Sequence, residues 1–210
     1  LLTLLLPEGA TPPARAEALT DQVYAACAAA GIAVVGGHTE VTHGLDRPIA
    51  VGALVGEVAR NRLVTPRGAT PGDRILLTKG VPIEGTAILA SEFGDRLDGV
   101  LTAAELASAR AFLSDPGLDV LRDARTALAA GGVHAMHDPT EGGLITALWE
   151  LAEASGRALV VDRERVAVPE LAGRVCAAFG LDPLATIASG ALLLTCPAAE
   201  APAIRRGLEA

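Results

Sequence analysis

The first sixty residues contain short apolar runs and one long amphipathic stretch. Residues 1–6, LLTLLL, are apolar except for Thr3, a pattern typical of a buried strand. Over residues 11–31, apolar side chains recur at helical spacing between two prolines and a closing glycine, which predicts a helix. Apolar runs at residues 32–35 and 49–58 predict two more strands, of which the first ends at Gly36 and Gly37.

A basic stretch rich in proline and glycine, RNRLVTPRGATPG at residues 60–72, predicts a domain boundary. Beyond it, strands are predicted at about residues 73–80, 133–137, 158–161 and 191–195. Helices are predicted at about residues 84–93, 103–113, 117–130, 140–155, 169–179 and 197–208. Because the strands are short and irregularly spaced, the alternation predicts a mixed α+β fold.

Composition and charge exclude several classes of protein. Half of the 210 residues are hydrophobic, which is enough for a core, but the net charge is −8 and only 2% are aromatic. Without a basic cluster or aromatic residues to stack on bases, nucleic-acid binding is not expected. Three cysteines far apart in the chain form neither a disulfide framework nor a CxxC metal site, which indicates the cytoplasm.

The apolar start of the chain is not expected to cross or bind a membrane. It is far shorter than the roughly 20 residues of a membrane-spanning helix, and it lacks the basic start of a signal peptide. The chain has no initiating methionine and opens within a strand pattern. We therefore expect the natural protein to begin upstream of Leu1.

The segment GGHTEVTHG at residues 36–44 is the first candidate for chemistry. If residues 38–42 form a strand, His38 and Glu40 project from the same face, where they could hold a metal or a magnesium-bound phosphate. With His43 the spacing H-x-E-x-x-H arises, but this is not the zinc-protease motif. The alternative is a strand end with a hydrogen-bonded histidine and a solvated glutamate.

The segment MHDPTEGGL at residues 136–144 is the second candidate. Asp138 follows a predicted strand, and Thr140, Gly142 and Gly143 open a helix. Free N–H groups at a helix start bind anions, and glycine lets a phosphate approach the backbone. Ordinary capping of the helix by Thr140 is the alternative.

Lys79, in the segment LTKGVPIEGT, is the third candidate. It follows a predicted strand and could reach a phosphate, although the P-loop pattern GxxxxGK[ST] is absent from the chain. The alternative is a surface lysine beside a turn. His134 is predicted to be structural, and His137 to be a neighbour of Asp138.

Taken together and in this order, several segments resemble the family of aminoimidazole ribonucleotide synthetase-related (PurM-like) proteins. The segments are GGHTEVT, VGALVGEV, PGDRILLTKG, IEGTAILA, HDPTEGGL, GLDPL and SGALLLT. The resemblance covers essentially the whole chain, and it is most similar to the hydrogenase maturation protein E branch. Thiamine-monophosphate kinase and selenophosphate synthetase belong to more distant branches.

The resemblance implies a PurM-like two-domain architecture and a nucleotide. Residues 1–62 would be the remainder of an N-terminally truncated ATP-binding and dimerisation domain, and residues 70–210 the C-terminal mixed α+β domain. ATP and Mg²⁺ would lie between them, and the N-terminal sheet would form a homodimer. The partners implied are a small-molecule substrate and a maturation partner protein.

The resemblance also assigns roles to the candidate residues. Glu40 and Asp138 would bind the metal, and His38, Lys79 and Asp138 would be catalytic. The positions implied for nucleotide binding are Gly36, Gly37, Thr39, Thr140, Gly142 and Gly143.

Three features depart from the family pattern. His38 stands where most relatives have an aspartate, and Mg²⁺ prefers oxygen ligands. The upstream pair of aspartates that helps to hold magnesium in relatives has no counterpart here. Neither has the terminal cysteine tail, since the sequence ends AIRRGLEA.

Two functions follow as hypotheses. The first is an ATP-dependent enzyme that activates a small substrate oxygen by phosphoryl transfer, in the manner of the hydrogenase maturation branch. The second is a non-catalytic nucleotide-binding or scaffold protein that kept the fold without turnover. The departures at His38 and at the aspartate pair motivate the second hypothesis.

Overall fold

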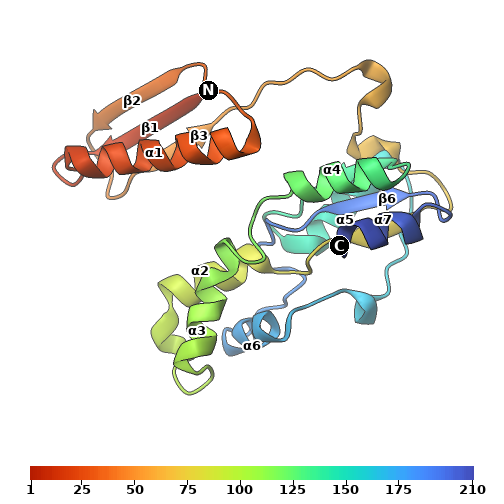
Figure 1. Cartoon of the computed structure of the whole chain (residues 1–210). Helices are drawn as coiled ribbons and strands as arrows, with labels where there is room; N and C mark the ends of the chain where they lie inside the picture. The colour runs from red at the N-terminus through yellow and green to blue at the C-terminus, as the bar shows by residue number, and fades with distance from the viewer. The chain divides into compact units, whose positions relative to one another are not determined.

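The computed structural model describes residues 1–210 and divides into two compact units, Leu1–Arg62 and Leu63–Ala210 (Figure 1). Both units combine helices with strands, which confirms the α+β expectation. None of the helices has the length and hydropathy of a membrane-spanning segment.

The first unit is a three-stranded sheet with one helix. Its strands are β1 (Leu2–Pro7), β2 (Gly37–Thr42) and β3 (Ile49–Gly52), in the order β2-β1-β3. β1 runs parallel to β2 and antiparallel to β3. The helix α1 (Pro13–Ala30) lies along one face of the sheet (Figure 1), and Leu4 and Leu6 are buried.

The opposite face of this sheet is uncovered. The register places Leu5 beside Glu40 on β2 and beside Ile49 on β3, so these three side chains share a face. Val51, two residues further along β3, lies on the same face and is more than half exposed. The face carries His38 and Glu40 on β2 and is apolar at Leu5, Ile49 and Val51. Its exposed apolar part indicates a contact surface.

The second unit is a three-layer arrangement around a second sheet. Its strands are β4 (Arg74–Leu77), β5 (Ala135–His137) and β6 (Leu193–Cys196), in the order β4-β6-β5. Helix α5 (Gly143–Ser155) packs on one face through Leu144, Ala147 and Leu151. Helices α4 (Leu121–Ala130) and α7 (Ala201–Leu208) pack on the other face (Figure 1).

Three more helices form a satellite cluster with its own small core (Figure 1). They are α2 (Ile83–Glu92), α3 (Ala103–Arg110) and α6 (Glu170–Ala178). Short 3₁₀ turns lie at Arg60–Arg62, Pro66–Gly68, Gly94–Leu97, Ala111–Leu113 and Arg163–Arg165.

Most predicted elements are present, but four predictions are wrong in part. Residues 32–35 are not a strand, because the Ile32 amide closes α1 by donating to the Cys27 carbonyl, and β2 begins only at Gly37. The strand predicted at residues 49–58 ends at Gly52. Residues 158–161 are not a strand, because they pair with no other strand. Helix α4 begins at Leu121 rather than Gly117, because the Asp119 carboxylate accepts a hydrogen bond from the Leu121 amide.

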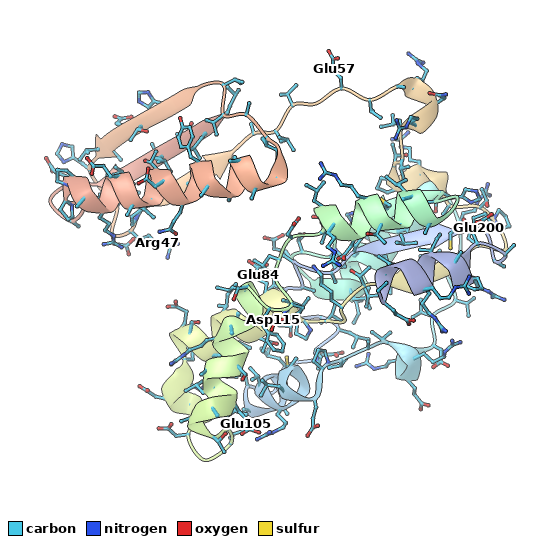
Figure 2. All side chains as sticks on the ribbon, in the orientation of Figure 1. Arg47, Glu57, Glu84, Glu105, Asp115 and Glu200 are labelled. Carbon is cyan, nitrogen blue, oxygen red and sulfur yellow. The ribbon has the colours of Figure 1, made fainter.

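Glu105 ties α3 to α6 (Figure 2). It forms an ion pair with Arg174, and its carboxylate accepts hydrogen bonds from the amide and hydroxyl of Thr102 at 2.7 and 2.9 Å. The Arg174 guanidinium and then the Thr102 donors lower the pKa of Glu105 from 4.5 to about 2.

This contact predicts an acid-dependent loss of stability. Because the carboxylate titrates at a lower pH in the folded state, its contribution is complete above pH 4.5 and is lost as the pH falls towards about 2. In urea titrations across this range, the unfolding midpoint of the wild type should fall more steeply than that of Glu105→Gln. Parallel curves for the two proteins would contradict the role of Glu105.

Candidate functional site

Two of the predicted site segments meet at one edge of the second sheet. β4 and β5 each pair antiparallel with β6, so they run parallel to each other. Leu77 at the end of β4 and His137 at the end of β5 both lie opposite Leu193. The segments that begin at Thr78 and Asp138 therefore leave the sheet at the same edge, the one where β4 and β5 end. Because β6 lies between these strands, the two segments are two strand spacings apart, or about 10 Å.

Asp138 presents an accessible carboxylate at this edge. Its side chain is 62% exposed, and its only ionic neighbour is His137, whose Nδ1 lies 3.9 Å from the Asp138 Oδ1. His137 itself is held by α5, because its Nε2 lies 2.6 Å from the Glu150 Oε2. Asp138 can therefore accept a cation or a hydrogen-bond donor without breaking a protein contact.

Lys79 lies at the same edge, but its ammonium group is already engaged. The Nζ donates to the carbonyl oxygens of Asp119 at 2.6 Å and Gly117 at 3.3 Å, and it lies 3.2 Å from the Asp123 carboxylate. The side chains of Lys79 and Asp123 are only 16% and 14% exposed. These contacts hold the loop before α4 against the end of β4. These contacts could not be predicted from the sequence, because Asp119 and Asp123 lie more than forty residues after the start of β4.

The start of α5 has no side-chain cap, so the capping alternative for Thr140 is not observed. Instead, the Gly143 amide donates to the Thr140 carbonyl at 3.0 Å, and the Ile145 amide donates to the Leu184 carbonyl at 3.1 Å. Gly142 and Gly143 both have left-handed backbone angles, with φ of 77° and 65°. Part of the predicted anion site is thus occupied by carbonyl oxygens of the chain itself, and its role in phosphate binding stays a prediction.

In the first unit, the strand pairing accounts for the second glycine of the GGHTEVT segment. A Cβ atom at Gly37 would lie 1.7 Å from the Leu2 carbonyl oxygen, so only glycine fits beside β1. Gly36 accepts a hydrogen bond from the Leu2 amide at its carbonyl. Both glycines thus position the start of β2, and their contact with a nucleotide stays a prediction.

His38 and Glu40 do share one face of β2, as the strand spacing predicts. The His38 Nε2 lies 3.4 Å from the Glu40 Oε2, and the two side chains are 66% and 53% exposed. Thr39 lies on the other face. His43 pairs with Glu8 in the turn that follows, so it takes no part in an H-x-E-x-x-H site.

The carboxylates suit magnesium only in combination with phosphate oxygens. No three His, Cys, Asp or Glu side chains gather closely enough to form a metal cluster. Mg²⁺ commonly binds one or two carboxylates and completes its shell with phosphates and water. The exposed carboxylate of Asp138 fits this role, and that of Glu40 fits it once His38 moves aside.

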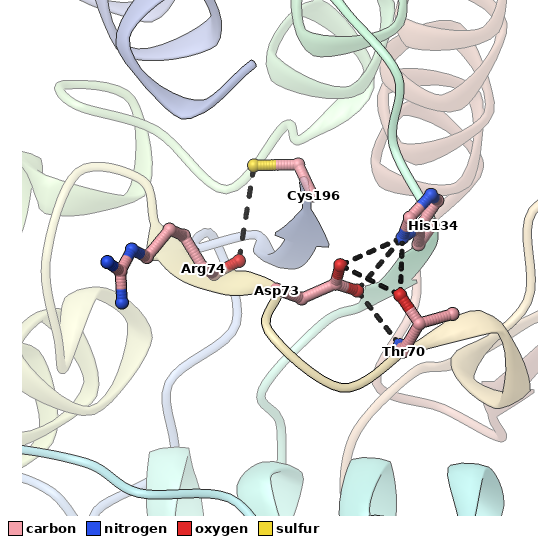
Figure 3. Close-up of polar contacts among 5 residues, drawn as sticks. All are labelled: Thr70, Asp73, Arg74, His134 and Cys196. Carbon is pink, nitrogen blue, oxygen red and sulfur yellow. Dashed lines mark hydrogen bonds and ion pairs between the residues drawn. The ribbon is translucent and has the colours of Figure 1, made fainter. Parts of the chain in front are cut away.

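A further polar cluster, which the sequence did not predict, joins the starts of β4 and β5 (Figure 3). The His134 Nδ1 lies 2.9 Å from the Asp73 Oδ1 and 3.2 Å from the Thr70 hydroxyl. Burial alone would raise the pKa of Asp73, but hydrogen bonds from the Thr70 amide and from His134 outweigh it and lower the pKa. His134 is structural, as predicted, because it holds this connection.

A groove of the second unit lies apart from the strand-end site. It has a volume of about 980 Å³ and runs along the outer side of β4. Residues of α5, α7 and the segment 157–167 complete its walls. The groove and the strand-end site are therefore separate features.

Comparison with known proteins places these features in a family. Residues 70–210 match the family model described as AIR synthase related protein, C-terminal domain. The chain is 32% identical over 204 residues to a protein named carbamoyl dehydratase HypE from Cupriavidus necator, covering 96% of this chain and 55% of the relative. The chain thus spans about half the length of the curated relatives it matches.

Solved structures give the same result. A hydrogenase maturation protein HypE superposes with a TM-score of 0.80 and 28% identity, over 99% of this chain and 62% of that one. A HypE structure in complex with ATP superposes with a TM-score of 0.73 and 25% identity, over 99% of this chain and 59% of that one.

Proposed function

Because the chain belongs to the AIR synthase-related (PurM-like) superfamily, we propose that it acts in an ATP-dependent reaction of the HypE type, in cytoplasmic hydrogenase maturation. The observation that carries this proposal is the free carboxylate of Asp138 at the edge where β4 and β5 end. The relatives named carbamoyl dehydratase, and the HypE structure solved with ATP, support it.

The proposed chemistry is phosphoryl transfer to a small substrate's oxygen. That oxygen attacks the γ-phosphorus, a new P–O bond forms, and the bond to the β-phosphate oxygen breaks to release ADP. Bound Mg-ATP supplies the phosphoryl group and much of the charge neutralisation. Of this chain's residues, Asp138 and Glu40 would bind the cation through carboxylate oxygens, and His38 would orient the substrate.

The remaining nucleotide contacts are proposed from backbone groups. Gly36, Gly37 and Thr39 begin β2 and would lie along the nucleotide, while Thr140, Gly142 and Gly143 would offer the amides that α5 leaves free. Lys79 is not part of the proposal, because three oxygen atoms of the chain already hold its ammonium group.

Replacing Asp138 with asparagine tests the proposal. The change removes the charge and keeps the size of the side chain, so we expect Mg-ATP binding to weaken about 10- to 100-fold. Binding of ATP in excess EDTA should be unchanged, because no cation is then shared. Calorimetric titration of the full-length protein measures both affinities.

Glu141→Gln is the matched control, because Glu141 is an exposed carboxylate in the same loop with no ion-pair partner. Its affinity for Mg-ATP should equal that of the wild type. Equal weakening by both substitutions would indicate a general charge effect, and an unchanged Asp138→Asn protein would contradict the assignment.

The pair His38–Glu40 favours a second candidate function. The imidazole contacts the carboxylate that would otherwise bind the cation, and it replaces an oxygen ligand. A protein without turnover would tolerate a histidine in place of the oxygen ligand. Such a protein would only bind nucleotide or serve as a scaffold for a maturation partner. ADP formation above the enzyme-free control, with any substrate, would exclude the second function.

We also propose that the β3 side of this uncovered face forms a homodimer, which leaves His38 and Glu40 on β2, across β1, free for the nucleotide site. Leu5, Ile49 and Val51 share that face, and Leu54 and Val55 of the following segment are exposed as well. Burying this apolar surface against a second copy is favourable. Sedimentation of the full-length protein as a monomer at all concentrations would contradict this association.

A further inference from the structure

The groove of about 980 Å³ beside β4 has the position of a missing strand. β4 is at the edge of the sheet order β4-β6-β5, and β6 is its only strand neighbour. Leu144 and Leu148 of α5 line the groove from one layer, and Ala201 and Pro202 of α7 line it from the other. The groove therefore continues the plane of the sheet between its two helical layers.

The β4 wall of the groove offers unpaired main-chain groups. The Thr78 amide donates to the Leu192 carbonyl, and the Leu192 amide donates to the Thr78 hydroxyl, so Thr78 faces Leu192 as a residue of a hydrogen-bonded pair does. Because such pairs alternate with outward-facing residues, Ile75 and Leu77 direct their N–H and C=O groups away from β6. These groups face the groove, and no other strand pairs with them.

The opposite wall is also unpaired. Residues 158–161, with the sequence ALVV, form neither a helix nor a strand, and their main-chain groups take part in no backbone hydrogen bond. Leu159 packs against the core, whereas the Val160 side chain is 93% exposed. A β-prone segment without a strand partner thus runs opposite an edge strand without a strand partner.

The groove carries positive charge in a chain whose net charge is −8. Arg74, Arg157 and Arg165 line it without a carboxylate partner. Of the two lining carboxylates, Asp73 is bound to His134, and Asp162 accepts a hydrogen bond from the Glu164 amide. The groove is therefore complementary to a ligand that brings its own carboxylates.

We propose that this groove binds an extended, acidic peptide segment of a partner protein, which adds a strand between β4 and residues 158–161. Main-chain hydrogen bonds to both walls would give affinity, as in other cases of strand addition. The apolar layers on either side call for apolar side chains in the middle of the segment, and the arginines call for carboxylates near its ends. Since β4 has four residues, the bound segment would have about five.

A peptide explains the groove better than a small anion does. Three arginines could hold a phosphate, but a phosphate would leave the main-chain groups of Ile75, Leu77 and residues 158–161 unpaired. It would also leave the leucines of α5 uncovered. Only a polypeptide strand satisfies the main-chain groups, the apolar layers and the charges together.

The test uses the full-length protein and the synthetic peptide acetyl-EVIVE-amide. Hydrogen exchange at the amides of Ile75 and Leu77 should slow at least tenfold when the peptide is added. Acetyl-KVIVK-amide should bind at least tenfold more weakly, because its lysines meet the arginines. An EVIVE peptide N-methylated on the alternate residues that face β4 should give no protection, since the methyl groups remove the donors of that edge and block its pairing.

Charge reversal in the groove sharpens the test. The double variant Arg74→Glu, Arg157→Glu should bind the EVIVE peptide at least tenfold more weakly than the wild type does. It should bind the KVIVK peptide at least tenfold more tightly. Both arginines are exposed and unpaired, so the fold should be retained. Arg206→Glu, an exposed position on α7 outside the groove, is the control and should change neither affinity.

Several outcomes would overturn the proposal. Slow exchange at Ile75 and Leu77 without peptide would show that the edge is already paired, by another segment or, if it depends on protein concentration, by a second copy. Equal binding of the two peptides would remove the role of charge. Inorganic phosphate that displaces the EVIVE peptide at equal concentration would identify a small-anion site instead.

Discussion

Replacing Gly143 with alanine is expected to destabilise the second unit by about 3 kcal/mol or more. Gly143 has φ of 65°, where an L-residue costs about 1–2 kcal/mol. A Cβ atom there would also lie 2.6 Å from the carbonyl oxygens of Leu184 and Thr186. Main-chain atoms cannot move aside as a flexible side chain can, so overpacking adds about 1–3 kcal/mol.

Gly156, at the other end of α5, is the matched control. It has φ of 63°, but nothing lies within 4 Å of the position of its Cβ atom. Gly156→Ala should therefore cost only the backbone term, about 1–2 kcal/mol. Urea unfolding followed by the fluorescence of Trp149, the only tryptophan and a residue of α5, measures both variants. Equal losses would show that the close approach to residues 184–186 carries no energy.

The two glycines of HDPTEGGL show where sequence reasoning reaches its limit. The sequence predicted a strand, a turn and a helix around them, and the structure contains β5 and α5 in those places. It could not show that the Leu184 carbonyl accepts a hydrogen bond from the Ile145 amide, or that the Ala188 amide donates to the Thr140 carbonyl. A glycine needed for a phosphate and a glycine needed for a neighbouring loop look the same in one sequence.

The wrong strand predictions have a related cause. Residues 32–35 and 158–161 have the β-branched and apolar composition of strands, yet neither is one. In each case a main-chain amide at the start of the segment closes the preceding helix. The Ile32 amide donates to a carbonyl of α1, and the Arg157 amide, just before residue 158, donates to a carbonyl of α5. A segment with high β-propensity forms a strand only where a partner strand is present. Pairing depends on residues far away in the sequence, so one segment's composition does not reveal it. The helices were predicted more accurately because their hydrogen bonds are internal.

The polar contacts that position the strand-end site were also beyond the sequence. Asp138 could be singled out because it follows a strand, but the partners of Lys79 come from a distant loop and the partner of His137 from α5. Only the strand register brings Thr78 and Asp138 to one edge. The residues of the site could thus be predicted from the sequence, but the hydrogen bonds and ion pairs that they form could not.

Replacing Lys79 with methionine should lower the free energy of unfolding of the second unit by about 3 kcal/mol. The change keeps the aliphatic stem but removes the ammonium group from two carbonyl oxygens and from Asp123. Because both side chains of the ion pair are largely buried, the Asp123 carboxylate is left without its cation, and breaking such a pair is strongly destabilising. Urea unfolding followed by Trp149 fluorescence measures the loss.

A double-mutant cycle separates this structural role from a catalytic one. Asp123→Leu removes the buried carboxylate, so adding it to Lys79→Met should restore part of the lost stability, with a coupling of at least about 1 kcal/mol. The restoration will be incomplete, because the Thr78 hydroxyl donates to Asp123 and loses its acceptor. If Lys79→Met instead unfolds like the wild type and loses only Mg-ATP turnover, the lysine belongs to the reaction after all. If the two substitutions are additive in stability, the ion pair across β4 and α4 contributes nothing to the fold.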